Sequence, residues 1–274
     1  MQEFQDKVVV ITGGATGIGF SLARQLGQEG ARLILAGRRQ DRLDEAVAEL
    51  AGCGIRAMGR PCDVTVPADV EGLADFAWDR CGQVDAIINN AGIPPVISTT
   101  INAKPEDIER NFKVNVFGVW NGVSVFGKRF IKAGHPSGIY AVGSENSLFF
   151  GAPGGAMYVA AKHALHGMMD ALRSEAPEFL RIGLILPGFV KSEIGDNMDT
   201  AMDTDRYTRM VVEQIRQGEF YIVSHAHNMV HINKRYQEIT AAYAKYAPRY
   251  KGDEEFDLLT MLGSGDGSAI LGPR

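Results

Sequence analysis

Short apolar runs alternate with amphipathic stretches along most of this chain. The first run, residues 7–12 (KVVVIT), is rich in β-branched residues and lacks polar alternation, so it should be buried on both faces of a sheet. Further strands are expected at 32–36, 55–62, 84–88, 137–142, 181–186 and 220–223, with helices at 17–29, 41–51, 67–81, 105–132, 156–176, 204–217 and 228–245. This order predicts an α/β fold, a doubly wound parallel sheet with helices on both faces.

The length and composition fit one large domain. The chain has 274 residues, of which 45% are hydrophobic and 22% charged, so it can bury a sizeable core. No internal repeat or linker divides the pattern. We therefore expect a single folded domain over residues 1–250, followed by a flexible tail over 251–274, where Gly and acidic residues gather.

Charge and cysteine content exclude several classes of protein. The formal net charge of -5 is a poor match for nucleic acid, which needs clustered positive charge. Three cysteines predict reduced thiols in a cytoplasmic protein, without a disulfide framework or a metal site. No apolar run approaches the roughly 18 residues of a membrane span, and residues 1–7 lack the apolar core of a secretory signal, so no membrane association is expected.

A glycine-rich turn lies between the first strand and the first helix. Residues 12–19 read TGGATGIG, which places backbone N–H groups at a helix N-terminus, where the helix dipole favours an anion. Glycine lets the backbone approach a pyrophosphate closely. Such a turn alone is equally consistent with an ordinary tight connection, but the flanking strand and helix favour a dinucleotide site of the Rossmann type. The candidate residues are Gly13, Thr16, Gly17, Ile18 and Gly19.

Further motifs follow the glycine-rich turn in order along the chain: Asp63-Val64, Asn90-Ala91-Gly92, Asn115, Tyr158 with Lys162, and Pro187-Gly188. With these motifs the chain resembles the classical short-chain dehydrogenase/reductase family over about residues 5–225. The resemblance implies a dinucleotide-binding and catalytic domain in which further cofactor contacts come from Asp63 and Val64 after the third strand, from Asn90, Ala91 and Gly92 after the fourth, and from Pro187, Gly188, Val190 and Ser192 after the sixth. Ser192 stands where the family usually has Thr.

Tyr158 and Lys162 are four residues apart, so they share one face of a helix. A neighbouring ammonium lowers the pKa of a phenol, which would let Tyr158 exchange a proton with an alcohol or ketone oxygen. On a helix alone such a pair is usually structural, and the motifs upstream favour catalysis. The resemblance implies that both also contact the cofactor, that Asn115 holds a water linking Lys162 to solvent, and that hydride passes directly to substrate without a metal.

The catalytic serine requires a choice of register. In most relatives the serine precedes the tyrosine by 13 residues, a position that Glu145 occupies here. Ser144 lies 14 residues before Tyr158 and directly after the fifth strand, whereas Ser147 lies 11 residues before it. We predict that Ser144 is catalytic, that the glycine-rich segment before Tyr158 absorbs the extra residue, and that Glu145 faces the pocket mouth.

The end of the second strand distinguishes the two dinucleotides. An acidic residue there binds the ribose 2′-hydroxyl of NAD and repels a 2′-phosphate. This chain has Gly37 at that position, followed by Arg38 and Arg39, whose guanidinium groups suit a phosphate. NADP(H) is therefore favoured. NAD(H) remains the alternative, because Thr16 stands where many NADP-preferring relatives have Lys or Arg, and the two arginines would also suit a solvated turn.

The leading hypothesis is an NADP(H)-dependent alcohol dehydrogenase or carbonyl reductase acting on a small secondary alcohol or ketone. The alternatives are a dinucleotide-binding regulator or scaffold without catalysis, and an enzyme that reduces a C=C bond. The resemblance also implies a homo-oligomer, a tetramer paired through helices 105–132 and 156–176. The candidate pocket residues are mostly apolar: Ile93, Pro94, Pro95, Val96, Phe149, Phe150, Met157 and Phe189.

Overall fold

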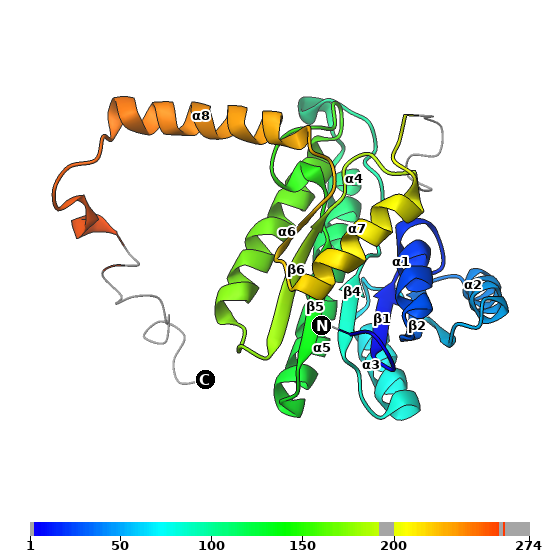
Figure 1. Ribbon diagram of the computed structural model, residues 1–274. Helices are drawn as coiled ribbons and strands as arrows, with labels where there is room; N and C mark the ends of the chain where they lie inside the picture. Colours follow the sequence, from blue (N-terminus) through cyan, green and yellow to red (C-terminus); the bar gives the residue numbers. More distant parts are fainter. Residues whose placement is uncertain (1–2, 192–199, 258–259, 261–274) are drawn as a thin grey trace. The chain divides into compact units, whose positions relative to one another are not determined.

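A single parallel sheet of seven strands forms the centre of the fold (Figure 1). The computed structural model describes residues 3–191, 200–257 and 260. The strand order is β3-β2-β1-β4-β5-β6-β7, and every pair is parallel. The strands are β1 (Val8–Thr12), β2 (Arg32–Gly37), β3 (Ala57–Pro61), β4 (Ala86–Asn89), β5 (Ser137–Val142), β6 (Leu180–Leu186) and β7 (Tyr221–Val223). The predicted doubly wound sheet is confirmed.

Helices cover both faces of the sheet, as the unbroken apolar strands require. They are α1 (Gly17–Gln28), α2 (Gln40–Gly52), α3 (Pro67–Cys81), α4 (Pro105–Phe112), α5 (Gly118–Ala133), α6 (Ala156–Glu175), α7 (Thr204–Gln217) and α8 (Asn228–Tyr246). Buried side chains of α1, α2 and α7 form one core with Val9 and Ile11 of β1. Those of α3, α5 and α6 form the other core with Val8 and Val10. The alternation along β1 therefore divides a uniformly apolar strand between two cores.

The helix predicted over 105–132 is interrupted, so that part of the prediction is wrong. Residues Lys113–Phe117 form a π-helical turn between α4 and α5. Asn115 lies within this turn and is completely buried. A π-turn widens the helix locally and is common at functional sites. Here it accompanies the hydrogen bonds of Asn115 to the chain that follows β4, described below.

The strand order reverses at β1, which pairs with β2 on one side and with β4 on the other. The segments that follow β1 and β4 therefore leave the carboxyl edge of the sheet in opposite directions. A crevice at this switch point is where parallel α/β sheets bind their ligands. Every sequence motif described above falls on this carboxyl edge or on the helix that follows it.

Contacts divide the chain into two units, Met1–Asn228 and Met229–Arg274. The first contains the whole sheet and α1 to α7, and the second begins with α8. A short 3₁₀ turn, Asp253–Phe256, follows α8, and most of the expected tail lies outside the described residues. The domain boundary at residue 250 stays a prediction. Among the helices that the structure describes, none has both the length and the apolar character needed to cross a bilayer.

Candidate active site

The glycine-rich turn after β1 has backbone φ angles that residues with a Cβ rarely adopt. Gly13 and Gly17 have φ angles of 62° and 54°, in the left-handed region. A Cβ at Gly19 would lie 2.3 Å from the carbonyl oxygen of Gly13, closer than atoms can approach. The spacing of these glycines thus lets the first turn of α1 fold tightly against the loop, with its free N–H groups at the crevice.

Hydrogen bonds join this turn to the chain that leaves β4. The hydroxyl oxygen of Thr12 accepts from the backbone N–H groups of Asn90, at 3.0 Å, and Ala91, at 3.1 Å. The side-chain amide of Asn90 donates to the carbonyls of Thr12, at 2.9 Å, and Gly13, at 3.1 Å. The two loops on either side of the switch point are therefore fixed relative to each other, largely by backbone groups.

A cavity of about 320 Å³ opens beside these loops. Nine of the predicted cofactor residues and five basic side chains are in its lining. The full lining is Gly13, Ala15, Thr16, Ala36, Gly37, Arg38, Arg39, Arg42, Cys62, Asp63, Val64, Thr65, Ala91, Gly92, Ile93, Arg110, Lys113 and Val114. Sequence reasoning missed Arg42, Arg110 and Lys113. Arg42 lies in the first turn of α2, four residues after Arg38, and its nearness in sequence could have identified it. Arg110 and Lys113 come from α4 and the π-turn, and only the fold brings them here.

The electrostatics of this cavity centre on Asp63. Burial raises the pKa of its carboxyl, but the backbone and hydroxyl groups of Thr65, which hydrogen bond to it, together with the charges of Arg38 and Lys113, outweigh burial and hold the pKa below its ordinary value. A Cβ at Gly37 would meet only Leu43, at 3.9 Å. The strand end therefore has room for a larger group beside the two arginines that follow it.

A second cavity, of about 170 Å³, continues from the first and shares five lining residues with it. It is lined by Gly13, Thr16, Gly17, Ile18, Asn90, Ala91, Gly92, Ile93, Asn115, Val142, Gly143, Tyr158, Lys162 and Pro187. The backbone N–H groups of both cavities, together with the guanidinium donors and the Asp63 carboxylate acceptor of the first, would fit a dinucleotide with its phosphates toward the α1 N-terminus.

Ser144 and Tyr158 form a hydrogen bond through their side chains. The Ser144 oxygen also accepts from the backbone N–H of Asn146, at 3.1 Å, and from its side-chain amide, at 3.2 Å. Those two bonds occupy the acceptor positions of the hydroxyl, so its proton is directed toward Tyr158. Ser147 is buried and accepts from the backbone N–H of Ser144. Of the two serines, the geometry thus places Ser144 beside the tyrosine.

Lys162 lies beneath the Tyr158 ring, with Nζ 5.4 Å from the ring centroid. Its ammonium is buried and donates to the carbonyl of Val142 at 2.8 Å, and burial lowers its pKa to about 8. The expectation that the ammonium lowers the pKa of Tyr158 is wrong for the protein alone. Burial raises the pKa of the phenol, the hydrogen bond from Ser144 opposes that rise, and the charge of Glu145 adds to it.

Asn115 anchors the chain that follows β4. Its side-chain oxygen accepts from the backbone N–H of Ile93 at 3.0 Å, and its amide donates to the carbonyl of Ile93 and to Asn111, both at 3.0 Å. A Cβ at Gly92 would lie 2.8 Å from that oxygen and 3.9 Å from Nζ of Lys162. Asn115 therefore holds this loop against the lysine, and its predicted role in holding a water stays a prediction.

Glu145 lies at the edge of the site, next to the chain leaving β6. Its backbone N–H donates to the carbonyl of Pro187 at 2.8 Å. A Cβ at Gly188 would lie 2.8 Å from its carboxylate oxygen and 2.5 Å from Nδ1 of His225. Glycine at 188 thus allows the carboxylate and the imidazole to approach each other. Sequence reasoning did not connect His225 with this site, because only the fold brings β7 beside β6.

The remaining predicted site residues do not all lie at the two cavities. Gly188 and Val190 do not line either cavity, and Val190 is buried in a bridge to Met202. Ser192 lies outside the described residues. Among the candidate pocket residues, Phe149 and Met157 are buried, whereas Val96, Phe150 and Phe189 are exposed. Exposed apolar side chains of this kind suit an apolar ligand better than a strongly charged one.

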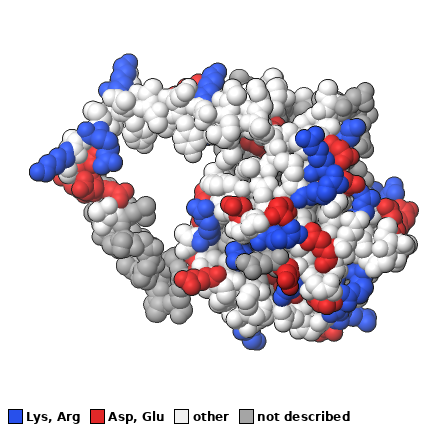
Figure 2. Space-filling view, in the orientation of Figure 1, with Lys and Arg blue, Asp and Glu red and all other residues white. Residues whose placement is uncertain are grey.

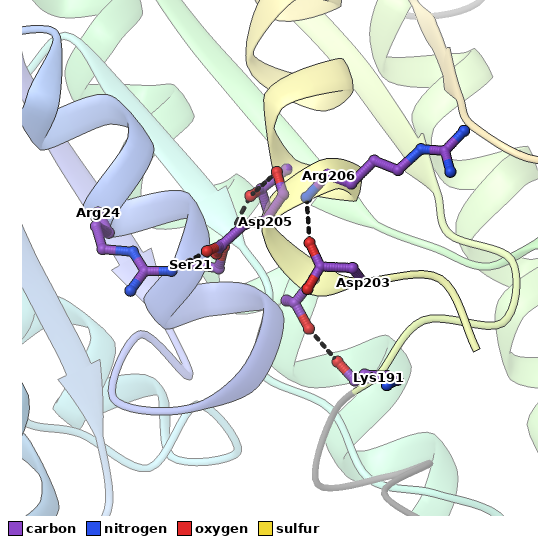
Figure 3. Close-up of polar contacts among 8 residues, drawn as sticks. Ser21, Arg24, Lys191, Asp203, Asp205 and Arg206 are labelled. Atoms are coloured by element: carbon purple, nitrogen blue, oxygen red, sulfur yellow. Dashed lines mark hydrogen bonds and ion pairs between the residues drawn. The ribbon is translucent and has the colours of Figure 1, made fainter. Parts of the chain in front are cut away.

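A polar cluster joins α1 to α7 (Figure 3). The Ser21 hydroxyl donates to Asp205 at 2.6 Å, and Arg24 forms an ion pair with the same carboxylate. Asp203 caps α7 by accepting from the backbone N–H of Arg206 at 2.8 Å. The helix α1, which follows the glycine-rich turn, is thereby tied to α7.

Comparison with known proteins agrees with this geometry. The family model described as short chain dehydrogenase matches residues 7–203. The chain is 29% identical over 245 residues to a 1-deoxy-11-beta-hydroxypentalenate dehydrogenase of Streptomyces avermitilis, covering 86% of this chain and 90% of that protein. It is 36% identical over 196 residues to an uncharacterized oxidoreductase of Listeria innocua, covering 69% and 77%.

The fold agrees as well. The structure of a short chain dehydrogenase/reductase from Burkholderia phymatum in complex with NAD superposes with a TM-score of 0.82 and 26% sequence identity, covering 88% of this chain and 97% of that one. A family match over most of the chain and a matching fold lead to one conclusion. The chain belongs to the short-chain dehydrogenase/reductase family of oxidoreductases.

Proposed function

We propose that this protein interconverts a secondary alcohol and a ketone with NADP(H) as the hydride carrier. The observation that carries the proposal is the Ser144–Tyr158 hydrogen bond above the buried ammonium of Lys162, at the end of a groove suited to a dinucleotide. A bound nicotinamide would supply or accept the hydride. Proton transfer would then be the task of the protein.

Each side chain has a distinct part in that proton transfer. Ser144 has a single proton to donate, since Asn146 occupies its acceptor positions, and it would turn this proton from Tyr158 to the substrate oxygen when substrate binds. Tyr158 gives its proton to the oxygen during reduction and takes it back during oxidation. Lys162 steadies the phenolate through its charge, and Asn115 holds the loop at Ile93 that faces the lysine. The high pKa of Tyr158 in the protein alone favours the protonated phenol that reduction requires.

The preference for NADP(H) is supported by the charges around the strand end. Arg38, Arg39 and Arg42 line the same cavity as Gly37, and a glycine rather than an acidic residue ends β2 there. The Burkholderia phymatum relative was solved with NAD, so NAD(H) is the cofactor to be excluded by experiment.

The substrate class is proposed from the pocket edge and from one relative. Phe150 and Phe189 expose apolar surface there, and Glu145 adds one polar group. The Streptomyces avermitilis relative is named for a hydroxypentalenate, which supports a hydroxyl-bearing substrate. We further propose a cytoplasmic homotetramer paired through α5 and α6, because Phe117, Trp120 and Ile131 near and on α5 are exposed.

A paired cofactor and substrate screen tests the proposal. The purified chain is assayed with NADPH and with NADH against apolar cyclic and aromatic ketones, and with the oxidised cofactors against the corresponding secondary alcohols. Reduced-cofactor absorbance reports turnover, and quenching of protein fluorescence reports binding. We expect turnover of at least one ketone with a higher kcat/KM for NADPH. Tight dinucleotide binding without turnover of any substrate would favour a non-catalytic regulator instead.

A further inference from the structure

The helix α8 has an apolar stripe that the proposed activity does not use. Six of its apolar and aromatic residues follow spacings of three and four in strict alternation: Met229, Ile232, Tyr236, Ile239, Tyr243 and Tyr246. Val230 lies outside this series. Tyr250, just beyond the helix, continues the series. We call these six helical residues the α8 seam. A repeat of seven residues with apolar first and fourth positions is the pattern of helices that pair side by side.

Three of the four charged residues of α8 lie away from the seam. Lys234, Glu238 and Lys245 occupy positions close to the opposite side of a helix of 3.6 residues per turn, whereas Arg235 lies at the edge of the seam. In Figure 2 the charged side chains of this helix gather along one edge, and the rest of its visible surface carries neither charge. No seam position holds an acidic or basic residue, so two copies of the seam can meet without repulsion.

The seam is exposed in the structure. None of the 19 residues of α8, all of them described, is buried, and Met229, Tyr236, Ile239, Tyr243 and Tyr246 are between 44% and 76% exposed. A helix of this length without a packed face is only marginally stable in water, because most helical stability in proteins comes from packing. The sequence therefore favours a partner surface for this face.

The area of the seam is close to what a stable complex needs. Three tyrosines of roughly 200 Å² each, together with one Met and two Ile at the observed exposures, offer on the order of 600 Å² per helix. A stable interface buries roughly 800 Å² per partner. Tyrosine also suits such a surface, because its ring is buried while its hydroxyl reaches water at the edge.

We propose that the α8 seam pairs with the α8 seam of a second copy of this chain, as a self-association surface separate from the helices α5 and α6. The alternating spacing of three and four supports a helix as the partner, and the absence of charge on the stripe supports an identical one. The proposal does not depend on the proposed activity, since α8 contains none of the cofactor or catalytic residues.

A matched pair of variants of the full chain tests this surface. Ile239→Glu places a carboxylate in the centre of the seam, and Ala241→Glu places the same group near the opposite side of the same helix. Sedimentation velocity at micromolar concentration should show a smaller assembly for Ile239→Glu, with association weakened at least tenfold, and the wild-type mass for Ala241→Glu. Equal masses for the wild type and both variants would overturn the proposal.

A cross-linking experiment gives a second readout that does not require destabilising the helix. In a Cys53→Ala background, Ile239→Cys should form a disulfide between two chains under mild oxidation, because Ile239 lies near the middle of the seam. Ala241→Cys should not. A monomeric Ile239→Cys band, with a lower melting temperature for Ile239→Glu at unchanged mass, would show that the seam packs within its own chain and would overturn the proposal.

Vesicles test the other surface that an apolar helix face could bind. The wild type is sedimented with vesicles of phosphatidylcholine and phosphatidylserine. We expect no binding above that of Ile239→Glu. Vesicle binding that Ile239→Glu abolishes while its mass stays unchanged would assign the seam to a membrane surface and would overturn the proposal.

Discussion

The two sides of the groove are built by different means. On the side after β1 and β4, the geometry comes from the backbone: left-handed glycines, a Cβ-free contact between Gly13 and Gly19, and main-chain hydrogen bonds to Thr12. On the side after β5, it comes from buried side chains, with Ser144, Asn146 and Lys162 each held by specific polar partners.

This difference bears on how each side tolerates change. A backbone-built site presents N–H groups that no single side chain supplies, so it binds phosphate in many sequences that keep the glycines. A site of buried ionisable groups is different, because burial disfavours each charged form and the pKa values depend on every neighbour. Single substitutions on the side after β5 should therefore lower catalysis without weakening dinucleotide binding.

Tyr158→Phe should produce the largest effect, a loss of catalysis that leaves dinucleotide binding intact. Removing the phenol leaves Ser144 without its proton-transfer partner while the ring still fills the space beside Lys162. We expect kcat/KM to fall by about a thousandfold, with dinucleotide affinity unchanged within about threefold. Steady-state kinetics and calorimetric titration measure the two quantities. A tenfold weaker cofactor affinity would show that the two sides are not separable.

The next effect concerns stability and comes from the buried ammonium. The pKa of Lys162 is lowered by burial from 10.5 to about 8, so between these values the unfolded chain holds a proton that the folded chain has released. Raising the pH through this window should favour the folded state, by on the order of 3 kcal/mol in the free energy of unfolding relative to Lys162→Met. Chemical unfolding from pH 7 to 10.5 measures this difference.

Lys132→Met, which removes an exposed lysine, serves as the control and should show no such pH dependence relative to the wild type. A parallel pH profile for wild type and Lys162→Met would mean that the ammonium at Lys162 is not desolvated in the folded protein.

Gly37→Asp tests the backbone side and should change cofactor preference more than catalysis. A Cβ at Gly37 meets only Leu43, at 3.9 Å, so the backbone accepts a side chain there, and aspartate would place a carboxylate where a 2′-phosphate is expected. We expect the ratio of kcat/KM for NADPH over NADH to fall by about ten- to a hundredfold. Gly37→Asn, of equal size without charge, should shift it less. A wild type that already prefers NADH would contradict the proposed cofactor.

The sequence predicted the backbone side better than the side-chain side, and the reason is physical. Each short apolar run became a strand, because burial on both faces leaves such runs few other structures, although β3 (Ala57–Pro61) is shorter than expected. The glycine turn was readable because left-handed backbone requires glycine locally. Arg110 and Lys113 were not found, since their place in the groove depends on how α4 packs.

Two other features depended on contacts that no local pattern encodes. The π-turn at Asn115 accompanies hydrogen bonds to Ile93 and Asn111, and periodicity predicted an unbroken helix there. The direction of the pKa shift of Tyr158 was mistaken because the helical spacing of Tyr158 and Lys162 shows their proximity but not their burial. Burial is a property of the folded chain, and it raises the pKa of Tyr158 by more than the hydrogen bond from Ser144 lowers it.

Glu145→Gln should have the smallest effect, a shift in the pH dependence of catalysis, and it tests how Glu145 contributes to the pKa of Tyr158. The charge of Glu145 contributes to the raised pKa of Tyr158, although less than burial does. Glutamine keeps the shape and removes the charge, so the phenol should ionise at lower pH than in the wild type. Alcohol oxidation needs the phenolate, and its rise in kcat/KM with pH should therefore begin at lower pH. Ketone reduction needs the phenol, and its decline should begin at lower pH as well.

Glu178→Gln, an exposed change far from this edge of the sheet, should leave both profiles in place. The shift should also be smaller than one caused by exposing the phenol to water, because Glu145 sits at the groove edge, where its field is partly screened. A profile that moves to higher pH, or does not move, would mean that the carboxylate is directed away from Tyr158 toward His225, which lies beside the same glycine. In that case Glu145 would act on the shape of the pocket mouth, and burial together with Ser144 would alone set the proton affinity of the tyrosine.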